Sequence, residues 1–111
     1  KLVSVERAIQ LMTEAPAQLF GLADRGRIAE GMRADVFVFD PETVGSEPAQ
    51  LVADLPGDSP RLIADATGVV RVLVNGVETI AQGKPTGNLP GTLLRSGRDT
   101  VTVDPSLATS A

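Results

Sequence analysis

The sequence predicts an α+β fragment: two short N-terminal helices, followed by a small part of a β-sandwich that ends in a hairpin. Three observations predict this fold class. Apolar residues recur at helical spacing near the N-terminus, and short Val-rich runs bounded by Gly and Pro follow. An Asn-Gly pair then separates two of these runs, which is a strong signal for a tight hairpin.

The first helix is expected from Ser4 to about Glu14. Ser4 is a favourable N-cap, and Glu6 in the first turn complements the helix dipole. Pro16 ends this helix and opens a second short one, because Pro suits a first helical turn but not a helix interior. Gly21 then closes the second helix as a left-handed C-cap.

Strands follow the helices. We expect a short strand at 26–29, a turn at 30–33 and a second strand at 34–40 that Pro41 ends. Val36–Phe39 is apolar on both faces, which is typical of a strand covered on both sides.

The hairpin is expected from Val69–Val74 and Val77–Ala81, with Asn75 and Gly76 in a type I′ turn. Residues 42–65, rich in Pro and Gly, are interpreted as a long irregular connection with an extended piece near 51–54. The domain division predicted from these patterns is 1–22 for the helices, 23–98 for the β-sandwich segment and 99–111 for a polar tail.

Composition excludes several functions. The net charge is −4 and the basic residues are scattered, so nucleic-acid binding is not expected. No apolar run approaches the roughly 20 residues of a membrane span, and no signal peptide precedes the first helix. We therefore expect a cytoplasmic protein that does not bind membranes.

The chain contains neither His nor Cys. Imidazole and thiolate carry most proton transfer and zinc ligation near neutral pH, and the serines have no His to activate them. Gly83, Lys84 and Thr86 resemble a phosphate loop only superficially, because Pro85 occupies the Ser/Thr position. The scattered aspartates are interpreted as structural, with Asp35 accepting backbone N–H bonds beside a strand. We predict no catalytic residue, no metal ligand and no cofactor within this chain.

Two longer segments carry a resemblance. GRIAEGMRADVFVFD at 26–40 and VLVNGVETIAQGKPTG at 72–87 resemble the closing signature of amidohydrolase-superfamily enzymes. Residues 4–22 are similar to that family's last barrel helix and the short linker helix after it. The residues taken as the structural signature are Gly26, Ile28, Gly31, Ala34, Asp35, Asp40, Asn75 and Gly76.

DLPGDSPRLI at 54–63 and GNLPGTLLRSGR at 87–98 resemble the tails of N-acyl-D-amino-acid deacylases, also called D-aminoacylases. Dihydropyrimidinases and dihydroorotases share the first signature but not usually the second tail. A parent enzyme acting on cyclic amides is therefore an alternative. An independent β-rich interaction module without an enzymatic parent is another.

The resemblance implies a parent with a (β/α)₈ barrel and a composite β-sandwich that N-terminal strands complete. One or two zinc ions would be held by His, carboxylate and Cys upstream of Lys1, and would activate the water that attacks the amide. This chain would be the non-catalytic C-terminal structural domain, and its partners would be that barrel and those strands.

The resemblance also implies which apolar residues are buried. Those expected in the sheet core are Ile28, Val36, Val38, Val70, Val72 and Val74. Those expected to pack on absent barrel helices are Ile9, Met12, Leu19 and Phe20. The chain by itself should then expose apolar surface, and we expect it to self-associate as a homo-oligomer, to swap strands or to fold loosely.

Overall fold

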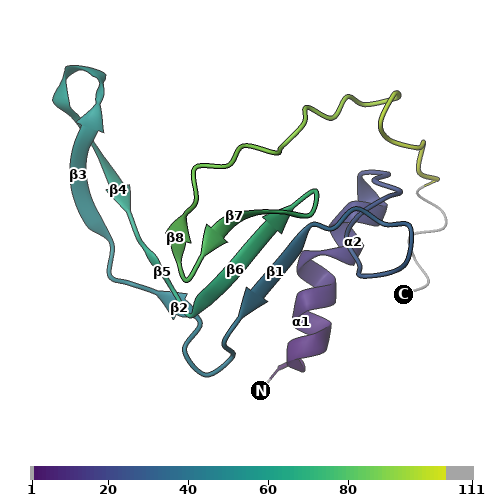
Figure 1. The fold of residues 1–111 in the computed structure, drawn as a ribbon, viewed down its shortest axis with the longest axis horizontal. Coiled ribbons are helices and arrows are strands. Elements are labelled where there is room, and N and C mark those ends of the chain that lie inside the picture. Colours follow the sequence, from purple (N-terminus) through teal and green to yellow (C-terminus); the bar gives the residue numbers. More distant parts are fainter. Residues whose placement is uncertain (1, 105–111) are drawn as a thin grey trace. The chain divides into compact units, whose positions relative to one another are not determined.

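The computed structural model describes residues 2–104 (Figure 1). Within that part of the chain two helices precede eight short strands, which confirms the α+β class. The described residues divide into two compact units: 2–36, 74–77 and 90–104 form one, and 37–73 with 78–89 form the other. No helix among the described residues is long and apolar enough to cross a membrane. Most of the predicted polar tail, from residue 105, lies outside the described residues.

The first helix begins where the sequence predicts. The Oγ of Ser4 accepts the N–H of Arg7 at 3.2 Å, and α1 (Val5–Met12) follows. The helix break, however, lies earlier than predicted, because α2 (Glu14–Leu19) begins before Pro16. A Pro ring clashes with the carbonyl four residues earlier, which here belongs to Met12, the last residue of α1. Pro16 itself lies in the first turn of α2, where no intrahelical N–H is needed.

The end of α2 confirms the predicted glycine cap. Gly21 has φ +67°, its N–H donates to Gln18 O at 3.1 Å, and Leu22 N–H donates to Ala17 O at 2.8 Å. These two bonds form the Schellman pattern. A Cβ on Gly21 would also lie 2.0 Å from the carbonyl oxygen of Val101, whose N–H donates to Gly21 O at 2.9 Å. Glycine is therefore required both for its φ and for the close approach of Val101.

The largest sheet has four strands in the order β1–β6–β7–β8. Their bounds are Val36–Phe39 for β1, Val69–Val74 for β6, Val77–Ala81 for β7 and Lys84–Pro85 for β8. Figure 1 shows β1 and β6 running in opposite directions. Asn75 and Gly76 have φ of 51° and 79°, which confirms the predicted hairpin turn. The short β8, paired antiparallel with β7, is an addition to the predicted elements.

The prediction of an irregular connection over 42–65 is wrong. β3 (Gln50–Leu55) and β4 (Ser59–Ile63) form an antiparallel hairpin through a 3₁₀ turn at Pro56–Asp58. β2 (Gly45–Ser46), which precedes this hairpin in the chain, pairs with β5 (Ala66–Thr67), which follows it. Pro60 lies opposite the register shift between Val52 and Leu55, so its missing N–H removes no regular ladder bond. Prolines that suggest a loop are thus accommodated within a hairpin.

Little of this chain is buried by itself. Among the described residues the buried apolar side chain is Ala17 of α2. Val36, Val72 and Val74 are half-buried, as expected for the sheet, whereas Val38 and Val70 are exposed. The core prediction is wrong for Ile28, which is 87% exposed and belongs to no strand. Strand β1, expected to be covered on both faces, exposes Phe37 as well as Val38 within this chain.

Candidate functional site

The signature segment 26–35 is a folded loop, and the strand predicted at 26–29 is wrong. Gly26 has φ +95°, and Arg33 N–H donates to Asp24 O at 2.7 Å, so the segment turns back on itself. A Cβ on Gly26 would lie 2.5 Å from Cβ of Ala17, which places the loop directly against α2. Gly31 has φ +81° with open space around it, so only its backbone conformation favours glycine there.

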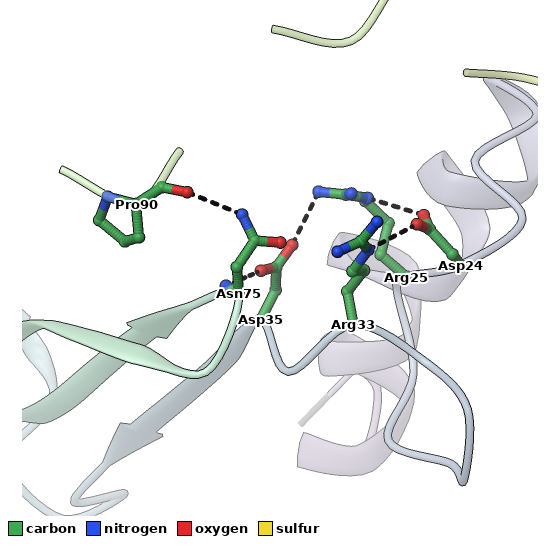
Figure 2. A network of polar contacts seen from close by, with 6 residues as sticks. All are labelled: Asp24, Arg25, Arg33, Asp35, Asn75 and Pro90. Carbon is green, nitrogen blue, oxygen red and sulfur yellow. Dashed lines mark hydrogen bonds and ion pairs between the residues drawn. The ribbon is translucent and has the colours of Figure 1, made fainter. Parts of the chain in front are cut away.

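Asp35 joins the loop to the turn of the β6–β7 hairpin. Its Oδ1 accepts the backbone N–H of Asn75 at 2.8 Å, and its Oδ2 accepts from Nη1 of Arg25 at 2.9 Å (Figure 2). A second backbone bond, from Gly76 N–H to Ala34 O at 2.9 Å, lies beside the first. The carboxylate therefore accepts a backbone N–H, as predicted, but from a residue 40 positions away.

Asn75 extends the network to the C-terminal segment. Its side-chain Nδ2 donates to the carbonyl of Pro90 at 2.8 Å, as Figure 2 shows. Because Asn75 also provides the positive φ of the hairpin turn, one residue both makes the turn and binds the segment after β8. Three stretches distant in sequence thus meet at Asp35 and Asn75.

A second carboxylate, Asp24, lies between two arginines. It accepts from Nε of Arg25 and from Nε of Arg33, each at 3.1 Å. The hydrogen bond from Arg25, followed by that from Arg33, lowers the pKa of Asp24 below its ordinary value. A carboxylate with a lowered pKa is a poor proton donor or acceptor near neutral pH, so this arrangement favours a structural role.

Four signature residues lie apart from this network. Asp40 belongs to the other unit and closes a local turn: Oδ1 accepts the N–H of Glu42 at 3.0 Å and Oδ2 accepts Oγ1 of Thr43 at 2.8 Å. These bonds, with the backbone one first, lower the pKa of Asp40. Ile28 lies exposed in the loop. Gly26 lies against α2, and Gly31 has open space around it. The signature residues that meet at the junction are Ala34, Asp35, Asn75 and Gly76.

Sequence reasoning missed the basic residues of the network and its last member. Arg25 and Arg33 provide its positive charge, and Pro90 provides its terminal acceptor. A signal was present, since the run Asp24 to Asp35 contains three arginines between two aspartates. Pro90 offered none, because a carbonyl acceptor does not depend on the side chain.

A pocket of about 290 Å³ lies beside α2 in the same unit. The residues that give it charge are Glu14, Arg25 and Arg27, and Met32 and Val101 add apolar surface. Arg25 is already bound to Asp24 and Asp35, and Arg27 lies 3.9 Å from Glu14. The charges around the pocket therefore neutralise one another.

The side chains present do not fit a zinc site. No group of three or more His, Cys, Asp or Glu within residues 2–104 lies close enough to hold a metal ion. The chain has no imidazole or thiol, and Asp24, Asp35 and Asp40 already accept two bonds each. The chemistry of this site is the joining of distant backbone segments by charged hydrogen bonds.

Three known enzymes are similar to this chain. The chain is 42% identical over 95 residues to an N-acyl-D-glutamate deacylase, covering 86% of this chain and 17% of that protein. It is 35% identical over 98 residues to an N-acyl-D-aspartate deacylase, covering 87% and 18%. It is 36% identical over 93 residues to a D-aminoacylase, covering 84% and 17%. All three relatives are from Alcaligenes xylosoxydans xylosoxydans.

The chain thus spans less than a fifth of the length of these relatives. No solved structure matches it. The model of the amidohydrolase family matches residues 1–86, which include both helices, the signature loop and the β6–β7 hairpin. By this match over most of its length, the chain belongs to the amidohydrolase family.

Proposed function

We propose that this chain is a non-catalytic structural part of a larger, zinc-dependent amidohydrolase that hydrolyses the amide of N-acyl-D-amino acids. The observation that carries the proposal is the set of three deacylases and aminoacylases that match 84–87% of this chain but only 17–18% of their own lengths. A shared segment that lacks imidazole and thiol groups is better suited to supporting a catalytic site than to forming one.

The local structure supports a scaffold role. Asp35 and Asn75 hold the signature loop, the hairpin turn and the segment at Pro90 together through bonds of 2.8–2.9 Å. Zinc would be held by residues upstream of Lys1, and when bound it supplies an activated water for amide hydrolysis. The parent would be cytoplasmic, with this segment packed on its barrel and N-terminal strands. The segment alone would associate with itself through its exposed apolar residues.

The test is made on the complete reading frame that contains this segment. The purified protein is assayed for release of the free amino acid from N-acetyl-D-glutamate, N-acetyl-D-aspartate and N-acetyl-D-leucine, with the L-enantiomers and hydantoin as controls. We expect hydrolysis of D-substrates, its loss with a chelator, and about one or two zinc ions per chain by elemental analysis.

Hydrolysis of hydantoin alone would favour the cyclic-amide alternative and contradict the deacylase proposal. A reading frame that starts with Met directly before Lys1 would favour an independent interaction module. Stoichiometric zinc binding and hydrolysis by residues 1–111 alone would contradict the scaffold role.

A further inference from the structure

The hairpin of β3 and β4 has two chemically different faces. Residues directly opposite each other in an antiparallel pair project to the same side, so Leu51 and Leu62 share one face. Val52 and Arg61 share the other. We call the first the leucine face and the second the arginine face.

The leucine face is open within this chain. Leu51 is 70% exposed and Leu62 is 72% exposed. Large apolar side chains that are exposed to water do not gain the stabilisation that burial provides. The two lie side by side across the ladder, so they form one patch and not two isolated exposed residues.

The arginine face suits water. Nε and Nη2 of Arg61 donate to the two carboxylate oxygens of Asp54 at 2.7 and 2.6 Å, and both side chains are largely exposed. This bond lowers the pKa of Asp54, so the pair stays charged at neutral pH. Covering this face would remove two charges from solvent, which is costly. A partner is therefore expected on the leucine face only.

The hairpin also lacks support from other strands. Among the described residues, β3 and β4 pair only with each other. A two-stranded ribbon is marginally stable in water and gains independence by packing one face on a neighbour. The turn also holds Asp58 at φ 55°, a left-handed conformation that is unfavourable for a residue with a side chain, so the turn adds backbone strain to that requirement.

We propose that the leucine face of the β3–β4 hairpin is a docking surface for the remainder of the same polypeptide, the part that precedes Lys1. This inference rests on the proposed function, and its basis is length: the relatives are more than five times longer than the segment they share with this chain. A surface within the same chain is present at a high effective concentration, so even a two-leucine patch binds it in preference to a second molecule.

The test uses thiol labelling on the complete protein. Leu62→Cys places a thiol on the leucine face, and Gln50→Cys places one on the arginine face, at an exposed position of the same hairpin. Labelling is counted above that of the unsubstituted protein and compared with the rate in urea. We expect the thiol of Leu62→Cys to react about 100-fold more slowly than in urea, and that of Gln50→Cys to react within a few-fold of its urea rate.

Equal rates at the two positions, whether both fast or both slow, would overturn the proposal. So would protection of the Leu62→Cys thiol that disappears on dilution together with a dimer in light scattering, because the occupant would then be a second copy. If Leu62→Cys fails to fold, hydroxyl-radical footprinting of Leu51 and Leu62 in the unsubstituted protein replaces it. Oxidation of both leucines in the native protein at the rate of the unfolded one would be contrary to the proposal.

Neither readout needs enzymatic activity. A protected leucine face in a protein that does not hydrolyse N-acyl-D-amino acids would reject the proposed substrate and keep the docking surface. An active deacylase in which the Leu62→Cys thiol is freely labelled would do the reverse.

Discussion

Two hairpins of this chain differ in how they are held. The β6–β7 hairpin has β1 on one side and β8 on the other, and Asp35 binds the backbone of its turn. Within the described residues, the β3–β4 hairpin has only its own ladder and one exposed ion pair, and it exposes Leu51 and Leu62 side by side. A regular ladder is therefore not evidence of an independent element. The first hairpin is supported by contacts within this chain, whereas for the second we propose support from a surface beyond it.

The largest expected effect comes from glycine at the base of the supported hairpin. Gly68, just before β6, has φ +68°, and a Cβ there would lie 2.3 Å from Val44 N. We expect Gly68→Ala to destabilise the complete protein by about 2–5 kcal/mol, through left-handed strain plus a backbone clash. Urea unfolding measures it.

The matched control for this prediction is Gly57→Ala at the tip of the other hairpin. Gly57 has φ +73° but open space around an added Cβ. The cost there should be about 1–2 kcal/mol from strain alone. Equal costs at the two glycines would show that packing around Gly68 is looser than the structure indicates.

The next effect comes from Asp35, which joins the supported hairpin to the signature loop. Asp35→Ala removes the acceptor for Asn75 N–H and for Arg25, and we expect a loss of about 1.5–3 kcal/mol. Asp35→Asn keeps one oxygen for Asn75 and should lose less. If both variants unfold at the urea concentration of the unsubstituted protein, the junction contributes nothing to stability.

A smaller effect depends on pH. Hydrogen bonds from Arg25 and then Arg33 lower the pKa of Asp24 in the folded chain, so its stabilising contribution is present above its ordinary pKa. That contribution is lost as the pH falls through the lowered folded value. For an exposed group, we expect about 0–1 kcal/mol of it. Asp24→Asn should reduce the acid sensitivity of the urea midpoint between about pH 5 and pH 2, and an unchanged pH profile would contradict this.

The smallest effect is expected at the ion pair of the unsupported hairpin. Asp54 and Arg61 form an exposed ion pair, so replacing Asp54 with Asn should leave the urea midpoint within the scatter of repeated measurements. A clear destabilisation that high salt does not reduce would mean that the arginine face is covered as well. That result would remove the difference between the two faces.

Residues with local consequences are predictable from the sequence. Ser4, Gly21, Asn75 and Gly76 act on the backbone within a few positions, through a cap or a positive φ, and the structure places each as expected. Residues whose role depends on distant neighbours are not. The sequence indicates Asp35 as an acceptor beside a strand, yet its donors come from Arg25 and Asn75. The β3–β4 hairpin escapes prediction because its prolines suggest a loop, although Pro60 lies opposite a bulge.

By itself, the amino-acid sequence determined the α+β class, the two helices, the β6–β7 turn and the absence of imidazole and thiol chemistry. Caps and turns depend on residues a few positions apart, and composition depends only on which residues the chain contains. Both can therefore be found by reading the sequence in order. Only the tertiary structure decided that Asp35 and Asn75 share a bond, that Gly26 lies against α2, and that the two leucines lie together on an open face. Each of these contacts depends on which distant segments lie next to each other. The register of the strand ladders and the turns between strands together determine which segments meet.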